Sequence, residues 1–181
     1  MANDPLHGLQ EVPSFELTST DAEDGKDFAK PQYSGKFGVP GGEDVSPQLS
    51  WSGAPDGTQS YVVTVLDPDA PTGSGFWHWA VADIPADVTE LPTGAGEGGN
   101  AKLPGNAFQL RHDGGAADFI GAAPPAGHGV HRYFFIVHAV DVASVRDLGV
   151  TEDSTPAFLG FILSSHTLAR AIMVPTAEIA G

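Results

Sequence analysis

Glycine and proline interrupt this chain so often that long regular elements are confined to a few stretches. The 181 residues include 23 glycines and 15 prolines, about one residue in five, whereas the usual share of the two together is about 12%. Proline fixes φ and lacks an amide hydrogen, and glycine weakens the interiors of helices and strands. The sequence therefore predicts a mainly β fold with many turns rather than a helical bundle. Because a chain of this length buries roughly 70% of its unfolded surface in one core, we expect a single domain over residues 1–181.

Several segments have the residue pattern of strands. The clearest is a β-branched run after Ser60, which is typical of a buried central strand and stops at Pro68. The polar, proline-containing segment Met1–Ser14 is predicted to be an N-terminal arm laid over the surface. The predicted strands are Phe15–Thr18, Ser46–Gly53, Tyr61–Leu66, Phe76–Ile84, Phe108–Leu110 and Arg132–Val142.

One segment near the C-terminus has helical periodicity. Apolar residues recur at spacings of three and four between Phe158 and Met173, and Ser154 or Asp153 is a candidate N-cap. A proline in the first turn is compatible with a helix, and Pro175 would end it. The pattern predicts a C-terminal helix over Pro156–Met173.

Charge and cysteine content exclude several classes of function. The chain has 23 acidic and 8 basic residues, which give a net charge of −15. Nucleic acids and anionic membrane surfaces attract clustered lysine and arginine, so neither is an expected partner. The chain has no cysteine. This excludes disulfides, thiolate metal sites and a cysteine nucleophile.

The sequence also predicts where the protein resides. The first residues lack the basic region and apolar run of a signal peptide. The most apolar stretch, Tyr133–Val140, is far shorter than the roughly 20 residues of a membrane-spanning helix. We therefore expect a cytoplasmic protein with no membrane insertion.

Ionisable side chains occur where predicted strands meet proline- or glycine-rich loops. Asp67 and Asp69 follow the central strand, and His128 and His131 precede another. His78 lies within a strand between two tryptophans, so it is expected to be desolvated and to need a hydrogen-bond partner. Taken singly, these features are typical of a rigid Asx turn, surface histidines and a core histidine. Their combination is what suggests a site.

The common catalytic templates are absent from the sequence. It contains no G-x-S-x-G elbow, no phosphate-binding G-x-x-x-x-G-K-[ST] loop, no G-x-G-x-x-G opening a helix and no H-E-x-x-H. His128 and His131, three residues apart, are a weak metal-binding pattern because loop histidines have no fixed geometry. We therefore assign no catalytic residues, no metal ligands and no cofactor.

Three motifs occur in the order and spacing of the phosphatidylethanolamine-binding protein family. They are DPDAP at Asp67–Pro71, WHW at Trp77–Trp79 and GVHRYFF at Gly129–Phe135. SPQLSWSG at Ser46–Gly53 and GAAPPAGHG at Gly121–Gly129 resemble the bacterial branch that is often called Raf kinase inhibitor-like. The resemblance extends from about Phe15 to the C-terminal helix, which is nearly the whole chain.

The resemblance implies a large antiparallel sheet packed on a smaller one, with peripheral helices and a C-terminal helix near the pocket. It also implies a small pocket for phosphate or a phospholipid head group. Ala123 stands where the family often has glycine before two prolines, which would narrow the mouth of the pocket. The residues that the resemblance assigns to the pocket are Asp67, His78, His131 and Tyr133, with Asp69, Pro71, Ala123, Pro124 and Pro125 as its wall.

The function that follows is a non-enzymatic binding protein for phosphate-bearing ligands, which would also modulate partner proteins. Its two histidines titrate near neutral pH and so are candidates to carry positive charge. Asp67 would either orient an imidazole or donate a hydrogen bond in its protonated form. Two alternatives stay open: a hydrolase that uses the aspartate and histidines, and a kinase or protease inhibitor that acts by protein contact. A homodimer is expected because two-fold pairing is the commonest arrangement of soluble homo-oligomers.

Overall fold

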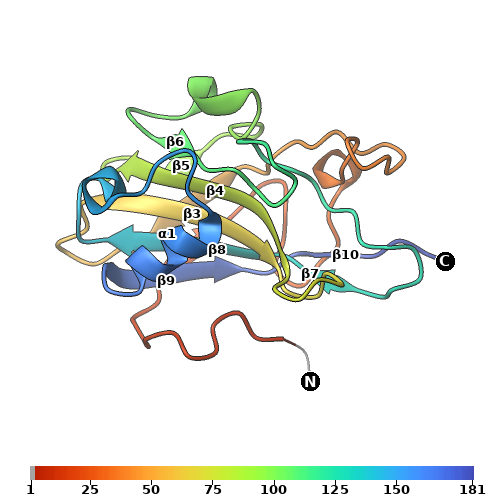
Figure 1. Ribbon diagram of the computed structural model, residues 1–181, viewed down its shortest axis with the longest axis horizontal. Helices are drawn as coiled ribbons and strands as arrows, with labels where there is room; N and C mark the ends of the chain where they lie inside the picture. The colour runs from red at the N-terminus through yellow and green to blue at the C-terminus, as the bar shows by residue number, and fades with distance from the viewer. Residues whose placement is uncertain (1–2) are drawn as a thin grey trace.

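A five-stranded antiparallel sheet forms the centre of the computed structural model, which describes residues 3–181 (Figure 1). Its strands lie in the order β6-β4-β3-β8-β9. A smaller sheet has the order β1-β2-β5, and β7 pairs with β10. This confirms the predicted mainly β class. The strands of the large sheet are β3 (Ser60–Asp67), β4 (Phe76–Pro85), β6 (Phe108–Gln109), β8 (Phe134–Val140) and β9 (Thr167–Met173).

The remaining elements are short. The small sheet consists of β1 (Glu16–Thr18), β2 (Leu49–Ser52) and β5 (Glu90–Leu91). The two-stranded ribbon consists of β7 (His131–Arg132) and β10 (Thr176–Ala177). The helical elements are the 3-10 turns η1 (Lys30–Gln32), η2 (Gly99–Lys102) and η3 (Val145–Leu148) and the helix α1 (Pro156–Leu163). No helix of residues 3–181 has the length and apolarity needed to cross a membrane.

The large sheet is covered on both faces. Val63, Val65 and Trp79 face the small sheet and form the main core with Leu49 and Trp51. A second apolar cluster lies on the other face, where Val62, Ala80 and Ala82 pack against Leu159 and Leu163 of α1. Burial on both faces explains why β3 and β4 have nearly continuous apolar sequences.

The predicted helix over Pro156–Met173 is wrong in its second half. α1 ends at Leu163, and residues 167–173 form β9, which pairs with β8 along its length. The apolar residues of this segment also fit a period of two, because Ala169, Ala171 and Met173 are buried while Ile172 is 38% exposed. Without β9, the backbone N–H and C=O groups along the free edge of β8 would have no partners. Forming these hydrogen bonds stabilises the strand conformation of residues 167–173 over the helix that their spacing also allows.

A β-bulge interrupts the pairing of β3 with β4. Val65 lies opposite Trp79 and Leu66 lies opposite Trp77, so His78 has no partner on β3. An extra residue of this kind changes the direction of the side chains that follow it. As a result His78 and Trp79 do not alternate as in a regular strand, and His78 turns toward the end of the sheet where the candidate site lies.

The N-terminal segment follows the edge of the large sheet. Backbone hydrogen bonds join Arg170 in β9 to Pro13 and Phe15, and the guanidinium of Arg170 donates to the carbonyl of Gln10. The predicted arm over Met1–Ser14 therefore lies against β9 from Gln10 onward. Its first two residues lie outside the described part of the chain.

Candidate functional site

A cavity of about 150 Å³ lies at the ends of β3, β4 and β7. Of the residues predicted for the site, Asp67, Pro71, His78, Ala123, Pro125, His131 and Tyr133 line it. Asp69 and Pro124 do not. No residue of α1 lines this cavity, so the C-terminal helix forms no part of its wall.

Asp67 holds His131 in place at the bottom of the cavity. Asp67 Oδ1 accepts hydrogen bonds from the amides of Asp69 and Ala70, at 2.8 and 3.0 Å, which is an Asx turn created by the DPDAP sequence. Asp67 Oδ2 lies 2.7 Å from Nδ1 of His131, and both side chains are buried. Both oxygens of Asp67 thus act as acceptors, which favours the first of its two expected roles, that of orienting the imidazole.

His131 has a partner on each ring nitrogen. Its Nδ1–H donates to Asp67, and its Nε2 lies 2.7 Å from Nδ1 of His128. The three side chains form a continuous hydrogen-bonded chain that runs from buried Asp67 to exposed His128. His131 therefore has no unpartnered ring nitrogen to offer to a ligand.

His78 presents a lone pair to the cavity. Its Nδ1 lies 2.8 Å from the carbonyl oxygen of Ile120, which only accepts, so Nδ1 carries the hydrogen. Burial lowers the pKa of His78 to about 4, so the ring is neutral at physiological pH. In that tautomer Nε2 is an acceptor. Of the two site histidines that were candidates to carry positive charge, His78 is therefore the one that stays neutral.

Tyr133 brings an unpartnered hydroxyl to the cavity. The residue is 1% exposed, and its hydroxyl has no hydrogen-bond partner among the described residues. Burial and the nearby charge of Asp67 raise its pKa, so it remains an O–H donor. A buried hydroxyl without a partner is unfavourable, and an acceptor atom placed in the cavity would relieve that cost.

Asp69 belongs to a separate ion pair beside the cavity. Its carboxylate accepts hydrogen bonds from the amide, Nε and Nη2 of Arg132 at 2.8–3.0 Å. These bonds from Arg132 lower the pKa of Asp69. The pair ties the DPDAP turn to β7, which positions His131. Asp69 is therefore a structural neighbour of the site rather than part of its wall.

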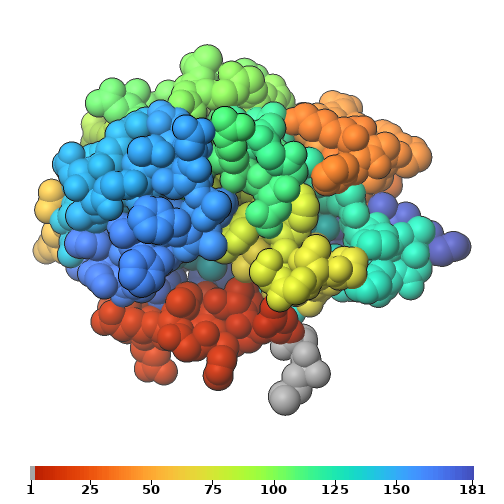
Figure 2. Space-filling view, viewed as in Figure 1, coloured from red at the N-terminus to blue at the C-terminus, as the bar shows by residue number. Residues whose placement is uncertain are grey.

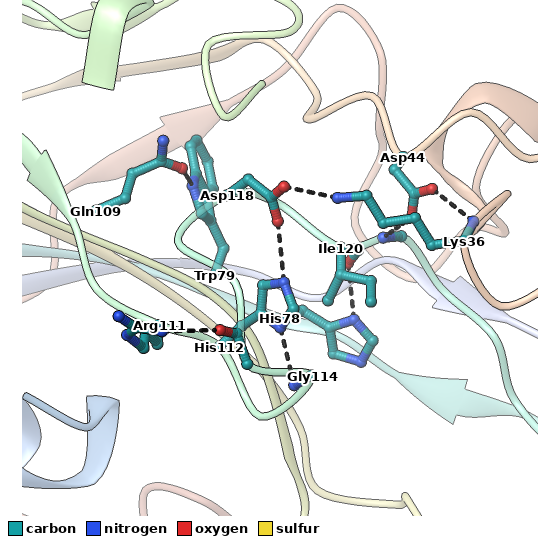
Figure 3. A network of polar contacts seen from close by, with 12 residues as sticks. Lys36, Asp44, His78, Trp79, Gln109, Arg111, His112, Gly114, Asp118 and Ile120 are labelled. Carbon is teal, nitrogen blue, oxygen red and sulfur yellow. Dashed lines mark hydrogen bonds and ion pairs between the residues drawn. The ribbon is translucent and has the colours of Figure 1, made fainter. Parts of the chain in front are cut away.

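A polar network supports the loop that carries Ile120 (Figure 3). The carboxylate of Asp118 accepts from Lys36 Nζ at 2.6 Å and from His112 Nε2 at 2.9 Å. On the other side of the loop, Asp44 accepts from the amides of Lys36 and Gly121. These contacts fix the carbonyl of Ile120 against His78 and so determine which nitrogen of that ring carries hydrogen.

Sequence reasoning missed four of the residues that line the cavity. They are Phe37, Ala70, Thr72 and Phe76. Ala70 and Thr72 lie within or beside the DPDAP motif, so the motif itself was a signal for them. Phe37 comes from a loop some thirty residues earlier in the chain, and nothing near it in sequence points to the site. Within residues 3–181 no group of three or more histidine, aspartate or glutamate side chains is arranged to hold a metal ion.

Comparison with known proteins identifies relatives of the chain. A family model described as phosphatidylethanolamine-binding protein matches residues 18–178. The UPF0098 protein YbcL of Escherichia coli K12 is 43% identical over 169 residues, which cover 93% of this chain and 90% of that protein. YbhB of the same strain is 44% identical over 157 residues, covering 87% and 96%. The crystal structure of E. coli YbcL superimposes with a TM-score of 0.87 over 92% of this chain and 99% of that one. The chain therefore belongs to the phosphatidylethanolamine-binding protein family.

Proposed function

We propose that the cavity lined by Asp67, His78, His131 and Tyr133 binds the phosphate group of a small ligand or phospholipid head group without transforming it. The observation that carries the proposal is the buried hydroxyl of Tyr133, which lines the cavity and has no hydrogen-bond partner among the described residues. Family membership supports a binding role of this kind. The cavity volume of about 150 Å³ equals that of about five water molecules, which suits a head group rather than a whole lipid.

The polar atoms of the cavity determine which hydrogen-bonding groups a ligand must carry. Tyr133 offers a donor, and the Nε2 lone pair of His78 offers an acceptor. A matching group has acceptor oxygens and at least one hydrogen of its own. A singly protonated phosphate monoester satisfies this, and so does a phosphodiester with a nearby ammonium group. Sulfate has the oxygens but no hydrogen at neutral pH, so it is a discriminating control.

Calorimetric titration with methyl phosphate, glycerophosphoethanolamine and sulfate at pH 6 tests the proposal. We expect both phosphates to bind at least tenfold more tightly than sulfate. Raising the pH to 8 removes the hydrogen of the monoester, whose second ionisation lies near pH 6. Its affinity should then fall about tenfold or more, while that of the diester stays within twofold. Equal affinity for sulfate, or no binding of either phosphate, would contradict the proposal.

The variant Tyr133→Phe removes only the hydroxyl. We expect phosphate affinity to fall on the order of tenfold, because a hydrogen bond to a charged acceptor is lost. Thermal stability should not fall, since the hydroxyl has no partner in the ligand-free protein. Tyr61→Phe is the matched control, because Tyr61 is also buried but does not line the cavity. Unchanged affinity in Tyr133→Phe would show that the cavity is not the phosphate site.

One observation also favours a hydrolase, the alternative weighed from the sequence. The chain of hydrogen bonds from Asp67 through His131 to exposed His128 has the form of a base held by an orienting carboxylate. Turnover of a p-nitrophenyl phosphate ester tests it, with His128→Gln as the variant. Activity that is lost in His128→Gln would replace the binding proposal with this one.

A further inference from the structure

A second and larger cavity, of about 320 Å³, lies on the face of the large sheet that α1 covers. Residues of α1 and of the N-terminal arm form its two sides. Figure 2 shows the arm (red) running along the molecule below the segment that contains α1 (blue). The lining is mainly apolar and includes Leu66, Trp77, Ile136 and Leu163. Arg170 also lines it.

Arg170 is buried in this wall without a negative partner. The residue is 8% exposed. Its Nη1 donates to the carbonyl of Gln10 at 2.8 Å, and its Nε has no hydrogen-bond partner in the described part of the chain. Each of the other three arginines forms an ion pair with a carboxylate, whereas none involves Arg170 within residues 3–181. In a chain with 23 acidic residues, this isolation of one arginine needs an explanation.

The surroundings of Arg170 do not neutralise its charge. His138 lies directly opposite on β8, and burial together with the charge of Arg170 lowers its pKa to about 3, so the ring is neutral. Glu11 lines a shallow hollow beside Arg170, but no ion pair within 4 Å joins the two side chains. Burial lowers the pKa of Arg170, although a guanidinium stays charged at neutral pH. A buried charge without a partner is costly.

We propose that this cavity binds a single-chain amphiphilic carboxylate, with its head on Arg170 and its chain along Leu66, Trp77 and Ile136. A carboxylate accepts two parallel N–H bonds from a guanidinium, and the free Nε–H of Arg170 offers one of them. The net charge of −15 disfavours ligands of high negative charge, so a monoanion is the best match. The volume lies at the lower end of the range for ligand cavities, which fits one medium-length chain.

Titration with decanoate and 1-decanol, both below their aggregation concentrations, tests the role of the charge. We expect the wild-type protein to bind decanoate at least tenfold more tightly than decanol, because a charge-assisted hydrogen bond is worth about ten- to a hundredfold in affinity. In Arg170→Met this preference should disappear, while binding of O-phosphoethanolamine stays unchanged. Replacing a buried charge by an apolar side chain is often tolerated, and the melting temperature checks that the variant is folded. Equal binding of decanoate and decanol by the wild type would overturn the proposal.

Gly160 provides a second test that does not depend on Arg170. It lies in α1 and lines the cavity, and a Cβ at this position would meet nothing within 4 Å. Gly160→Leu should therefore fold and fill the cavity, lowering decanoate affinity at least tenfold. Gly160→Ala is the matched control and should keep most of the affinity. Unchanged binding in Gly160→Leu would overturn the proposal. So would a wild-type dimer that Gly160→Leu dissociates in sedimentation, because the cavity would then be an interface between two copies of the chain.

Discussion

The two cavities differ in whether their charged side chains have partners. At the ends of β3 and β4, Asp67 accepts three hydrogen bonds and Asp69 is paired with Arg132, so the fixed charges are already compensated. What stays free there is neutral: one hydroxyl and one imidazole lone pair. Beneath α1 the lining is apolar, and the guanidinium of Arg170 has no counter-charge. The comparison teaches that the first cavity selects by hydrogen-bond pattern, whereas the second would select by charge.

The cavities also differ in how tightly the backbone around them is packed. The space that a Cβ atom would have at a nearby glycine shows the difference. Gly121 belongs to the loop behind the first cavity, and a Cβ there would lie 2.4 Å from the backbone carbon of Tyr33. We expect Gly121→Ala to lower the free energy of unfolding by about 1–3 kcal/mol, because the backbone of Tyr33 must shift. Urea unfolding measures the change. A loss below about 1 kcal/mol would show that this loop is less constrained than its contacts indicate.

Asp67→Asn removes the negative charge that pairs with His131 in the first cavity. The amide can still accept from the DPDAP turn, but it no longer supplies a carboxylate to His131 Nδ1. We expect phosphate affinity to fall about tenfold or more, because His131 loses the carboxylate that fixes its tautomer and the orientation of its ring in the cavity. The neighbouring Asp69→Asn is the control, since it weakens an ion pair outside the cavity and should change phosphate affinity by less than about threefold. Equal losses in the two variants would contradict the role given to Asp67.

His138 lines the second cavity, and its lowered pKa makes the stability of the protein depend on pH. Its pKa is about 3 in the folded protein, below the ordinary value of about 6.5. Between these values the unfolded chain binds a proton that the folded chain does not, so stability falls as the pH falls below about 6.5. We expect His138→Gln to reduce this slope by about 1.4 kcal/mol per pH unit between pH 6 and 4. Identical slopes for the two proteins, each referred to its own stability at pH 7.5, would show that burial does not suppress this charge.

Gly160→Ala gives the smallest effect and the opposite sign to Gly121→Ala. The position is helical and its Cβ would meet open space. Alanine should raise the free energy of unfolding by about 0.5–1 kcal/mol, because it is the better helix former. Thermal unfolding monitored by circular dichroism is sufficient to detect it. A destabilised variant would mean that the space beside α1 is already filled.

The strands that could be predicted from sequence are those with continuous apolar runs. Such runs mark β3, β4 and β8 because these strands are buried on both faces. The segment 167–173 was predicted as helix because its apolar spacing fits both periods, and only the free edge of β8 decides between them. The single domain, the cytoplasmic location and the homodimer stay predictions.

For the site, the motifs identified the residues but not their chemical roles. DPDAP, WHW and GVHRYFF contain five of the cavity-lining side chains predicted from sequence, among them Asp67, His78 and His131. The neutral state of His78 depends on its burial, and the choice of nitrogen that carries its hydrogen depends on the carbonyl of Ile120, 42 residues away. Phe37 and the isolation of Arg170 likewise depend on long-range packing, which no local pattern reports.

Imidazole nitrogen chemical shifts during a titration with O-phosphoethanolamine at pH 6 test the central claim most directly. The phosphate is predicted to move the signals of His78 Nε2 and of the linked pair His131 and His128, because these rings face the first cavity or share its hydrogen-bonded chain. His138, which faces the second cavity, should not respond. A response at His138 alone, or saturating phosphate that leaves His78 and His131 unchanged, would contradict the assignment of the first cavity as the phosphate site.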